Sequence, residues 1–310
     1  MEGEHRLEIL GLFPETDRPY WENILRKTGL TEIRLRAERE GYAYQSGKEF
    51  YLTGEGCLDT DRGKARIFSK EYLGKLLLHL CKYSIYAFED ELRAGYLTLE
   101  GGHRLGVAGQ VVMNGQEVHA IKNISFMNLR ICHQIIGFAD PVLPWVYEKG
   151  ELYNTLILSP PGCGKTTLLR DLIRQISAGN AFGEGCTVGV ADERAEIGGS
   201  YLGIPQNDLG PRTDIMEGCP KKIGLSLLLR SMAPRVLAVD EVGDPADWKY
   251  LQEAGRCGVK LLATMHGGTR EDICGRVPEG VFDRVIFLGK KRGIPYIRGY
   301  WNLKGEKGMG

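Results

Sequence analysis

Residues 156–170 read LILSPPGCGKTTLLR: an apolar run, a turn rich in glycine and proline, and the start of a new apolar pattern. The first run is typical of a buried parallel strand. The pattern that follows has the period of a helix, with apolar residues at Leu168, Leu169, Leu172, Ile173 and Ile176. This strand, loop and helix favour a phosphate-binding loop over an ordinary turn, because N–H groups at a helix start can converge on polyphosphate oxygens.

The loop departs at one position from the pattern G-x-x-x-x-G-K-[ST], which expects glycine where this chain has Ser159. Serine fits there if its backbone is not left-handed, and the half of the motif that wraps the phosphates is intact. In this interpretation Lys165 reaches the β- and γ-phosphates of ATP, and the hydroxyl of Thr166 binds Mg²⁺. The predicted nucleotide-binding residues are Ser159, Pro160, Pro161, Gly162, Cys163, Gly164, Lys165, Thr166 and Thr167.

Length and composition indicate an ordinary globular protein of 310 residues, long enough for two domains. Forty basic residues cancel forty acidic ones, so no global field favours nucleic acid or an anionic membrane as a partner. The eight cysteines are scattered without a C-x-x-C pair, which suits reduced thiols. We find no apolar signal-peptide region and no run of 18 apolar residues, so we expect a protein that is soluble or at most peripheral to a membrane.

The N-terminal part, residues 1–136, has the pattern of a smaller α+β domain. Ser69 is positioned to cap a helix with one apolar face. Residues 137–144 carry two prolines after a glycine and are predicted to be a linker to a second domain, 145–310. Strands are predicted at 31–36, 41–45, 49–52 and within 95–112.

In the second domain strands alternate with helices, which predicts a parallel sheet. Three of its apolar runs end in polar clusters: Asp192-Glu193, Asp240-Glu241 and His266. The carboxyl ends of parallel strands line the ligand crevice, so we expect these clusters to meet the phosphate loop. Asp240 would hold Mg²⁺, and Glu241 could orient or deprotonate the attacking water. Asp192-Glu193 as a capping turn, and His266 as an ordinary loop histidine, remain alternatives.

Several segments together resemble the stage III sporulation protein AA family. They are the phosphate loop and residues 32–36, 101–106, 192–197, 229–234 and 264–269. The resemblance covers most of the chain. It implies wider membership among the ATPases of type II and type IV secretion machines, which are RecA-like and typically form hexameric rings.

The resemblance also implies roles for residues outside the phosphate loop. Glu193 would lie in the aspartate box of secretion ATPases and His266 in their histidine box. Those ATPases often have glycine where this chain has Asp240, which leaves open whether Glu193 or Glu241 is the general base. Arginines that reach the nucleotide from the N-terminal domain or an adjacent subunit would be Arg130, Arg212 and Arg230.

The leading hypothesis is an ATP-hydrolysing motor of α/β fold, with a RecA-like P-loop domain behind the smaller α+β domain. By resemblance it would act in the mother-cell cytoplasm on membrane-embedded sporulation channel proteins. One alternative is a nucleic-acid-binding P-loop ATPase that uses Lys290, Lys291 and Arg292, but the balanced charge disfavours it. Another is a non-hydrolysing assembly scaffold, which the carboxylates of Glu193 and Glu241 disfavour.

Overall fold

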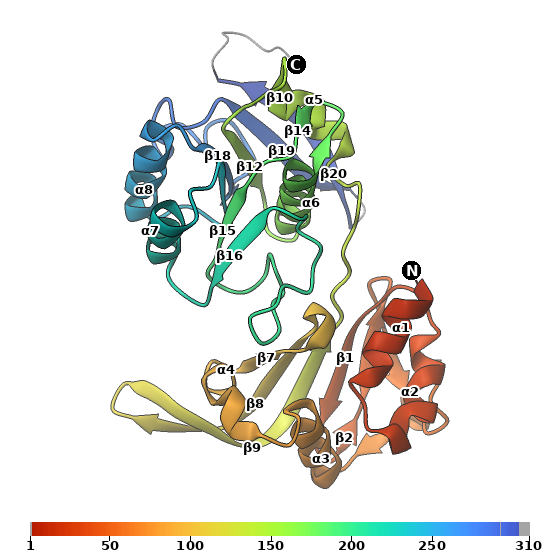
Figure 1. Ribbon diagram of the computed structural model, residues 1–310. Coiled ribbons are helices and arrows are strands. Elements are labelled where there is room, and N and C mark those ends of the chain that lie inside the picture. The colour runs from red at the N-terminus through yellow and green to blue at the C-terminus, as the bar shows by residue number, and fades with distance from the viewer. Residues whose placement is uncertain (1, 292, 304–310) are drawn as a thin grey trace. The chain divides into compact units, whose positions relative to one another are not determined.

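The computed structural model describes residues 2–291 and 293–303 and divides into two compact units (Figure 1). The first unit runs to His133 and also includes Gly199–Gln206. The second comprises Gln134–Gly198 and the chain from Asn207 onward. Arg292, named above as a nucleic-acid contact, and residues 304–310 of the expected second domain lie outside the described residues.

The first unit is built on an antiparallel sheet of seven strands in the order β5-β4-β3-β1-β9-β8-β7. In β1, Ile33 and Leu35 are buried while Glu32 and Arg34 are half-buried, as the period-two pattern predicts. The strands of this unit are β1 (Leu30–Arg36), β2 (Arg39–Glu40), β3 (Tyr42–Gln45), β4 (Lys48–Leu52), β5 (Leu58–Asp59), β6 (Ile67–Phe68), β7 (Tyr96–Thr98), β8 (Arg104–Asn114) and β9 (Glu117–Arg130).

Helices supply much of the core of the first unit, in which Trp21 stacks on Phe13 at a ring distance of 4.2 Å. Ser69 caps α3 as expected, because its hydroxyl accepts a hydrogen bond from the N–H of Tyr72 at 3.1 Å. The helices are α1 (Glu2–Gly11), α2 (Arg18–Leu25), α3 (Lys70–Leu80) and α4 (Glu89–Arg93).

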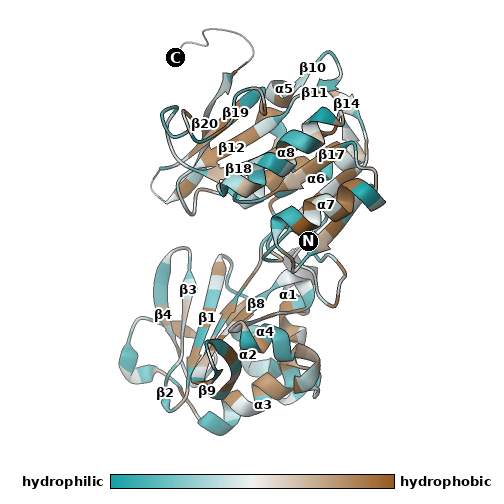
Figure 2. Cartoon of the chain, turned by 90° about the vertical axis from the view of Figure 1, so that its left-hand side faces the viewer, coloured by the Kyte–Doolittle hydropathy of each residue, from teal (hydrophilic) through white to brown (hydrophobic). Residues whose placement is uncertain are grey.

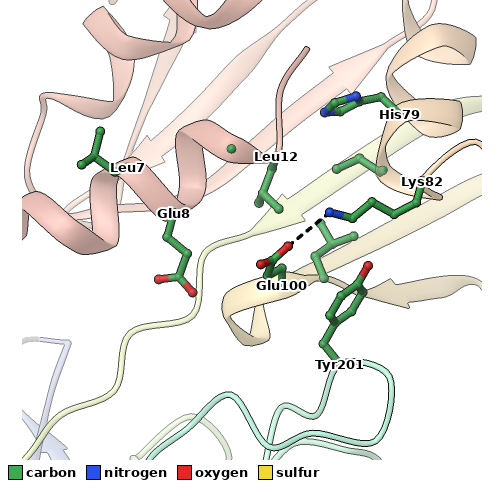
Figure 3. A pocket seen from close by; sticks show the side chains of 10 residues that line it. Leu7, Glu8, Leu12, His79, Lys82, Glu100 and Tyr201 are labelled. Atoms are coloured by element: carbon green, nitrogen blue, oxygen red, sulfur yellow. Dashed lines mark hydrogen bonds and ion pairs between the residues drawn. The ribbon is translucent and has the colours of Figure 1, made fainter. Parts of the chain in front are cut away.

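Gly199–Gln206 is the one part of the first unit that comes from far along the chain. The ring of Tyr201 stacks on that of Phe88, with centroids 6.4 Å apart. The side chain of Gln206 accepts a hydrogen bond from the N–H of Gly101 at 2.9 Å. Tyr201 also lines a pocket of about 180 Å³ that holds the ion pair of Lys82 and Glu100 at 3.2 Å (Figure 3).

The second unit contains a seven-stranded sheet in the order β16-β15-β17-β18-β12-β19-β20, parallel except for β20. Its strands are β12 (Thr155–Ser159), β15 (Val188–Asp192), β16 (Thr213–Glu217), β17 (Val236–Val239), β18 (Lys260–His266), β19 (Arg284–Lys291) and β20 (Ile294–Asn302). Two small hairpins add β10 (Tyr147–Glu148), β11 (Glu151–Leu152), β13 (Gly179–Asn180) and β14 (Gly183–Glu184).

Both faces of this sheet are covered, so every residue of the central strands β12 and β17 is buried, and most of these residues are apolar (Figure 2). Ile157 of β12 packs in a cluster with α6, whereas its neighbours Leu156 and Leu158 pack in a second cluster with α7 and α8. The helices are α5 (Leu143–Val146), α6 (Lys165–Ala178), α7 (Lys221–Ser231) and α8 (Pro245–Arg256). The expected parallel-core α/β domain is therefore present.

The boundary between the units differs in detail from the expected linker at 137–144. Ala139 and Val142 are fully buried in the core of the second unit, and the N–H of Ala139 donates to Asp171 of α6 at 2.8 Å. The two prolines shape a short helical turn that packs against α6 rather than an open connection. Within residues 2–291 and 293–303, no helix has the length and apolar character needed to cross a membrane.

Candidate active site

The polar clusters predicted at the strand ends lie along one edge of the second sheet. Parallel pairing puts Ser159, the last residue of β12, opposite His266, the last residue of β18. It also puts Ala191 of β15 opposite Val239 of β17, so Asp192 and Asp240 follow at the same level. The register therefore brings these ends together, as expected for parallel strands.

The loop between β12 and α6 has the geometry that a phosphate-binding loop needs. Gly162 and Gly164 adopt left-handed backbone angles, φ 70° and 84°, and Gly164 forms the N-cap of α6. Ser159 lies in the extended strand, so it does not need the freedom of the glycine that the motif expects. Cys163 is buried in the core, whereas Pro160 and Pro161 are exposed.

Lys165 is the first residue of α6 and is only 6% exposed. Its Nζ lies 3.0 Å from Nδ1 of His266 and donates to the carbonyl oxygen of Ser159 at 3.4 Å. Burial lowers the pKa of Lys165, while the nearby carboxylates of Asp240 and Glu241 act in the opposite direction. Neither of these two hydrogen-bond partners is a carboxylate. The charge of Lys165 is therefore available to an anion that binds beside its Nζ.

Thr166 and Asp240 form a pair of oxygen ligands beside Lys165. The Thr166 hydroxyl donates to Oδ2 of Asp240 at 2.7 Å, and the hydroxyl of Thr264 donates to Oδ1. Carboxylate and hydroxyl oxygens are the ligands that Mg²⁺ prefers. The structure therefore brings together the two residues predicted to hold the metal.

Glu241 follows Asp240 with a left-handed backbone, φ 53°, which is unusual for a residue with a side chain. Its carboxylate accepts from Nε2 of His266 at 3.0 Å and pairs with Arg194 at 3.2 Å. With Lys165 as the donor to Nδ1, the proton of His266 lies on Nε2 and points at Glu241. His266 thus connects the loop lysine to the strand-end carboxylate.

Asp192 organises the loop that follows β15. Its carboxylate accepts three backbone N–H bonds, each 2.9 Å long, from Glu196, Ile197 and Gly198. Arg170 of α6 donates to the carbonyl oxygens of Glu196 and Ile197 at 2.7 and 2.9 Å. Asp192 therefore acts as the capping residue of this turn, which was one of the two alternatives for Asp192-Glu193. The neighbouring Glu193 carboxylate is 40% exposed and lies 3.5 Å from Lys221.

Burial raises the pKa of Asp192 from 3.8 to about 6, and the three N–H bonds act against this shift. A raised carboxyl pKa stabilises the fold most at low pH, and this contribution is lost as pH rises through about 6. When the pH is lowered from 7.5 to 4.5, the free energy of unfolding of the wild type should therefore rise by about 2 kcal/mol relative to that of Asp192→Asn. Urea unfolding at both pH values measures this; a difference independent of pH would contradict it.

Of the three predicted arginines, Arg212 and Arg230 belong to the second unit and lie away from this cluster, whereas Arg130 belongs to the first unit. Arg212 donates to the carbonyl oxygens of Ser177 and Ala178, at the opposite end of α6 from Lys165. Arg230 is exposed in the last turn of α7. Arg130 ends β9 in the first unit, 62% exposed and 3.9 Å from Glu32.

Four residues of the cluster were not predicted as site residues from the sequence: Arg170, Arg194, Lys221 and Thr264. Thr264 could have been found, because it lies two residues before His266 in a strand and so shares its face. Lys221 carries a subtler signal, a lysine in the first turn of a helix, where the dipole disfavours cations. Arg170 acts through backbone carbonyls, for which the sequence has no pattern.

The chain is similar to known proteins over nearly its whole length. The family described as sporulation stage III, protein AA matches residues 13–308. Stage III sporulation protein AA of Bacillus subtilis is 37% identical over 294 residues, which cover 92% of each chain.

Solved structures share the fold at low sequence identity. The ATPase DotB of Legionella pneumophila has a TM-score of 0.60 at 14% identity, covering 93% of this chain and 80% of its own. The pilus retraction motor PilT has a TM-score of 0.58 at 17% identity, covering 87% and 78%. The predicted RecA-like α/β fold is confirmed, and the chain belongs to the sporulation stage III protein AA family.

Proposed function

We propose that this protein binds Mg²⁺-ATP at the strand-end cluster and hydrolyses it to ADP and phosphate. The observation that supports this most is the hydrogen-bonded chain from Lys165 through His266 to Glu241, beside the Thr166–Asp240 pair. One cluster thus contains a cation for the phosphates, oxygen ligands for a metal and a carboxylate for the attacking water. Phosphoryl transfer requires these three kinds of group.

The polyphosphate would bind over the start of α6, where free N–H groups and the helix dipole favour anions. Lys165 would then exchange His266 for phosphate oxygens, and the negative charge would favour its ammonium form. Lys290 adds a second cation, since a side chain built on Gly162 would begin 3.9 Å from its Nζ. Gly162, Lys165, His266 and Lys290 all belong to the second unit.

Thr166 and Asp240 would hold Mg²⁺, which supplies charge neutralisation to the transferred phosphoryl group. A carboxylate must then take a proton from the attacking water, and both Glu241 and Glu193 are available. Both oxygens of Glu241 have partners, His266 and Arg194, whereas Glu193 pairs with Lys221. Either assignment fits these contacts.

For the biological role, we propose a motor that drives a secretion-like channel complex between mother cell and forespore. Membership in the sporulation family supports the process, and the similarity in fold to a pilus retraction motor determined with ADP supports the mechanism. The motor would be a homo-oligomer, a hexameric ring, in the mother-cell cytoplasm. Its partners would be membrane-embedded sporulation channel proteins.

Two glutamine substitutions test which carboxylate is the base. Glu241→Gln should keep ATP binding and slow hydrolysis roughly 100-fold or more, because a positioned base contributes about that much. Phosphate release and nucleotide affinity are measured in parallel for Glu241→Gln and Glu193→Gln. A larger loss in Glu193→Gln would pass the role to Glu193. Full turnover in both variants would contradict the proposed site.

A further inference from the structure

Lys221 has a location that helix electrostatics does not favour. It is the first residue of α7, directly after the N-cap Pro220, and no acidic residue lies in that turn. A cation at this end opposes the helix dipole. Lys222 shares this unfavourable turn but is exposed, so the contacts of Lys221 distinguish the two lysines.

The ammonium of Lys221 joins two loops of the candidate site. Its Nζ donates to the backbone carbonyl oxygen of Glu241 at 2.6 Å and lies 3.5 Å from Oε2 of Glu193. The side chain is 18% exposed, so solvent screens these contacts only in part. One cation therefore contacts the loops that follow β15 and β17, and with them both candidate bases.

Lys221 contacts Glu241 at a backbone position that is strained. A left-handed conformation in a residue with a side chain persists only when its surroundings hold it. The N–H of Glu241 donates to Oδ1 of Asp240 at 3.0 Å and to the hydroxyl of Thr264 at 2.9 Å. Lys221 holds the carbonyl of the same residue, so the two sides of Glu241 are fixed by different elements.

Arg194 also links the two loops, but in a weaker way. It pairs with the Glu241 carboxylate at 3.2 Å while 66% exposed, and exposed ion pairs are screened by water and salt. Arg194 contacts the side chain of Glu241, whereas Lys221 contacts its main chain.

We propose that Lys221 is a positioning residue for hydrolysis, which sets the backbone of Glu241 and keeps the Glu193 carboxylate beside it. The inference rests on the proposed ATPase function. A misplacement of about 1 Å in a reacting group can cost on the order of 100-fold in rate, so a group that fixes a base need not touch ATP. Its removal should therefore lower turnover and spare nucleotide binding.

The test compares Lys221→Met with Lys222→Met, the neighbouring exposed lysine. Lys221→Met should lower kcat by about 10-fold or more and leave the ATP dissociation constant within about 3-fold. Lys221→Arg, which keeps the charge, should recover part of the rate. Lys222→Met should match wild type. If Lys221→Met does not fold, Lys221→Gln takes its place.

Amide hydrogen exchange of residues 240–243 gives a readout that does not need activity. The N–H of Val242 donates to the carbonyl oxygen of Thr264 at 2.8 Å, so this segment is protected in wild type. Exchange should rise about 10-fold in Lys221→Met and not in Lys222→Met. Equal exchange in the two variants overturns the inference, even if wild type proves inactive. Loss of ATP binding in Lys221→Met overturns it too, because Lys221 would then be a phosphate ligand.

Discussion

Lys165→Ala is expected to reduce ATP hydrolysis to background and to weaken nucleotide binding strongly. In the proposed site Lys165 is the loop cation that would contact the β- and γ-phosphates, and alanine has no group that can replace it. Phosphate release and the affinity for a fluorescent ATP analogue measure the two effects. Unchanged turnover in the purified variant would contradict the assignment of the phosphate loop.

A control must separate this effect from misfolding, because Lys165 is buried and bonded to Ser159 and His266. Lys222→Ala removes an exposed lysine from the same unit and should keep both activity and binding. Thermal unfolding of both variants should show a folded protein. The loss in Lys165→Ala would then reflect lost phosphate contacts.

The second large effect concerns assembly. Turnover per subunit should rise steeply with protein concentration, and Arg130→Ala should remove that rise without preventing ATP binding. An arginine supplied by a neighbouring subunit can contribute on the order of 1,000-fold in rate. Arg130→Lys should also be impaired, because lysine lacks the two-pronged contact that a guanidinium makes with phosphate. Turnover at a series of concentrations is the measurement.

Mixing Arg130→Ala with Lys165→Ala subunits decides whether the arginine acts across an interface. Some mixed interfaces then pair an intact phosphate loop with an intact arginine, so activity should partly return. Arg26→Ala is the matched control, since Arg26 is 59% exposed, near the 62% of Arg130, and likewise pairs with a glutamate. If mixing restores nothing, the assignment in trans fails.

Much of the second unit could be predicted because its strands are continuous apolar runs that end in polar residues. That pattern placed Asp192, Asp240 and His266 at the carboxyl edge of a parallel sheet, where the structure has them. The phosphate loop was also predictable, since its glycines and lysine are consecutive in the chain. The roles of these residues in catalysis stay predictions.

Other features depend on contacts between distant segments. The left-handed backbone of Glu241 is set by Thr264 and Lys221, and neither contact leaves a local pattern. Residues 199–206 interrupt the second unit in sequence. They join the first unit through the stacking of Tyr201 on Phe88 and a hydrogen bond that Gln206 accepts from the N–H of Gly101. Sequence periodicity reports which face of an element is buried but not the partner that covers it.

The most direct test of the proposed site is a structure of the full chain with Mg²⁺ and a non-hydrolysable ATP analogue. We expect phosphates at the start of α6, with Lys165 Nζ moved from His266 to a phosphate oxygen and Mg²⁺ beside Thr166 and Asp240. A nucleotide bound elsewhere, with the contact of Lys165 and His266 intact, would contradict it.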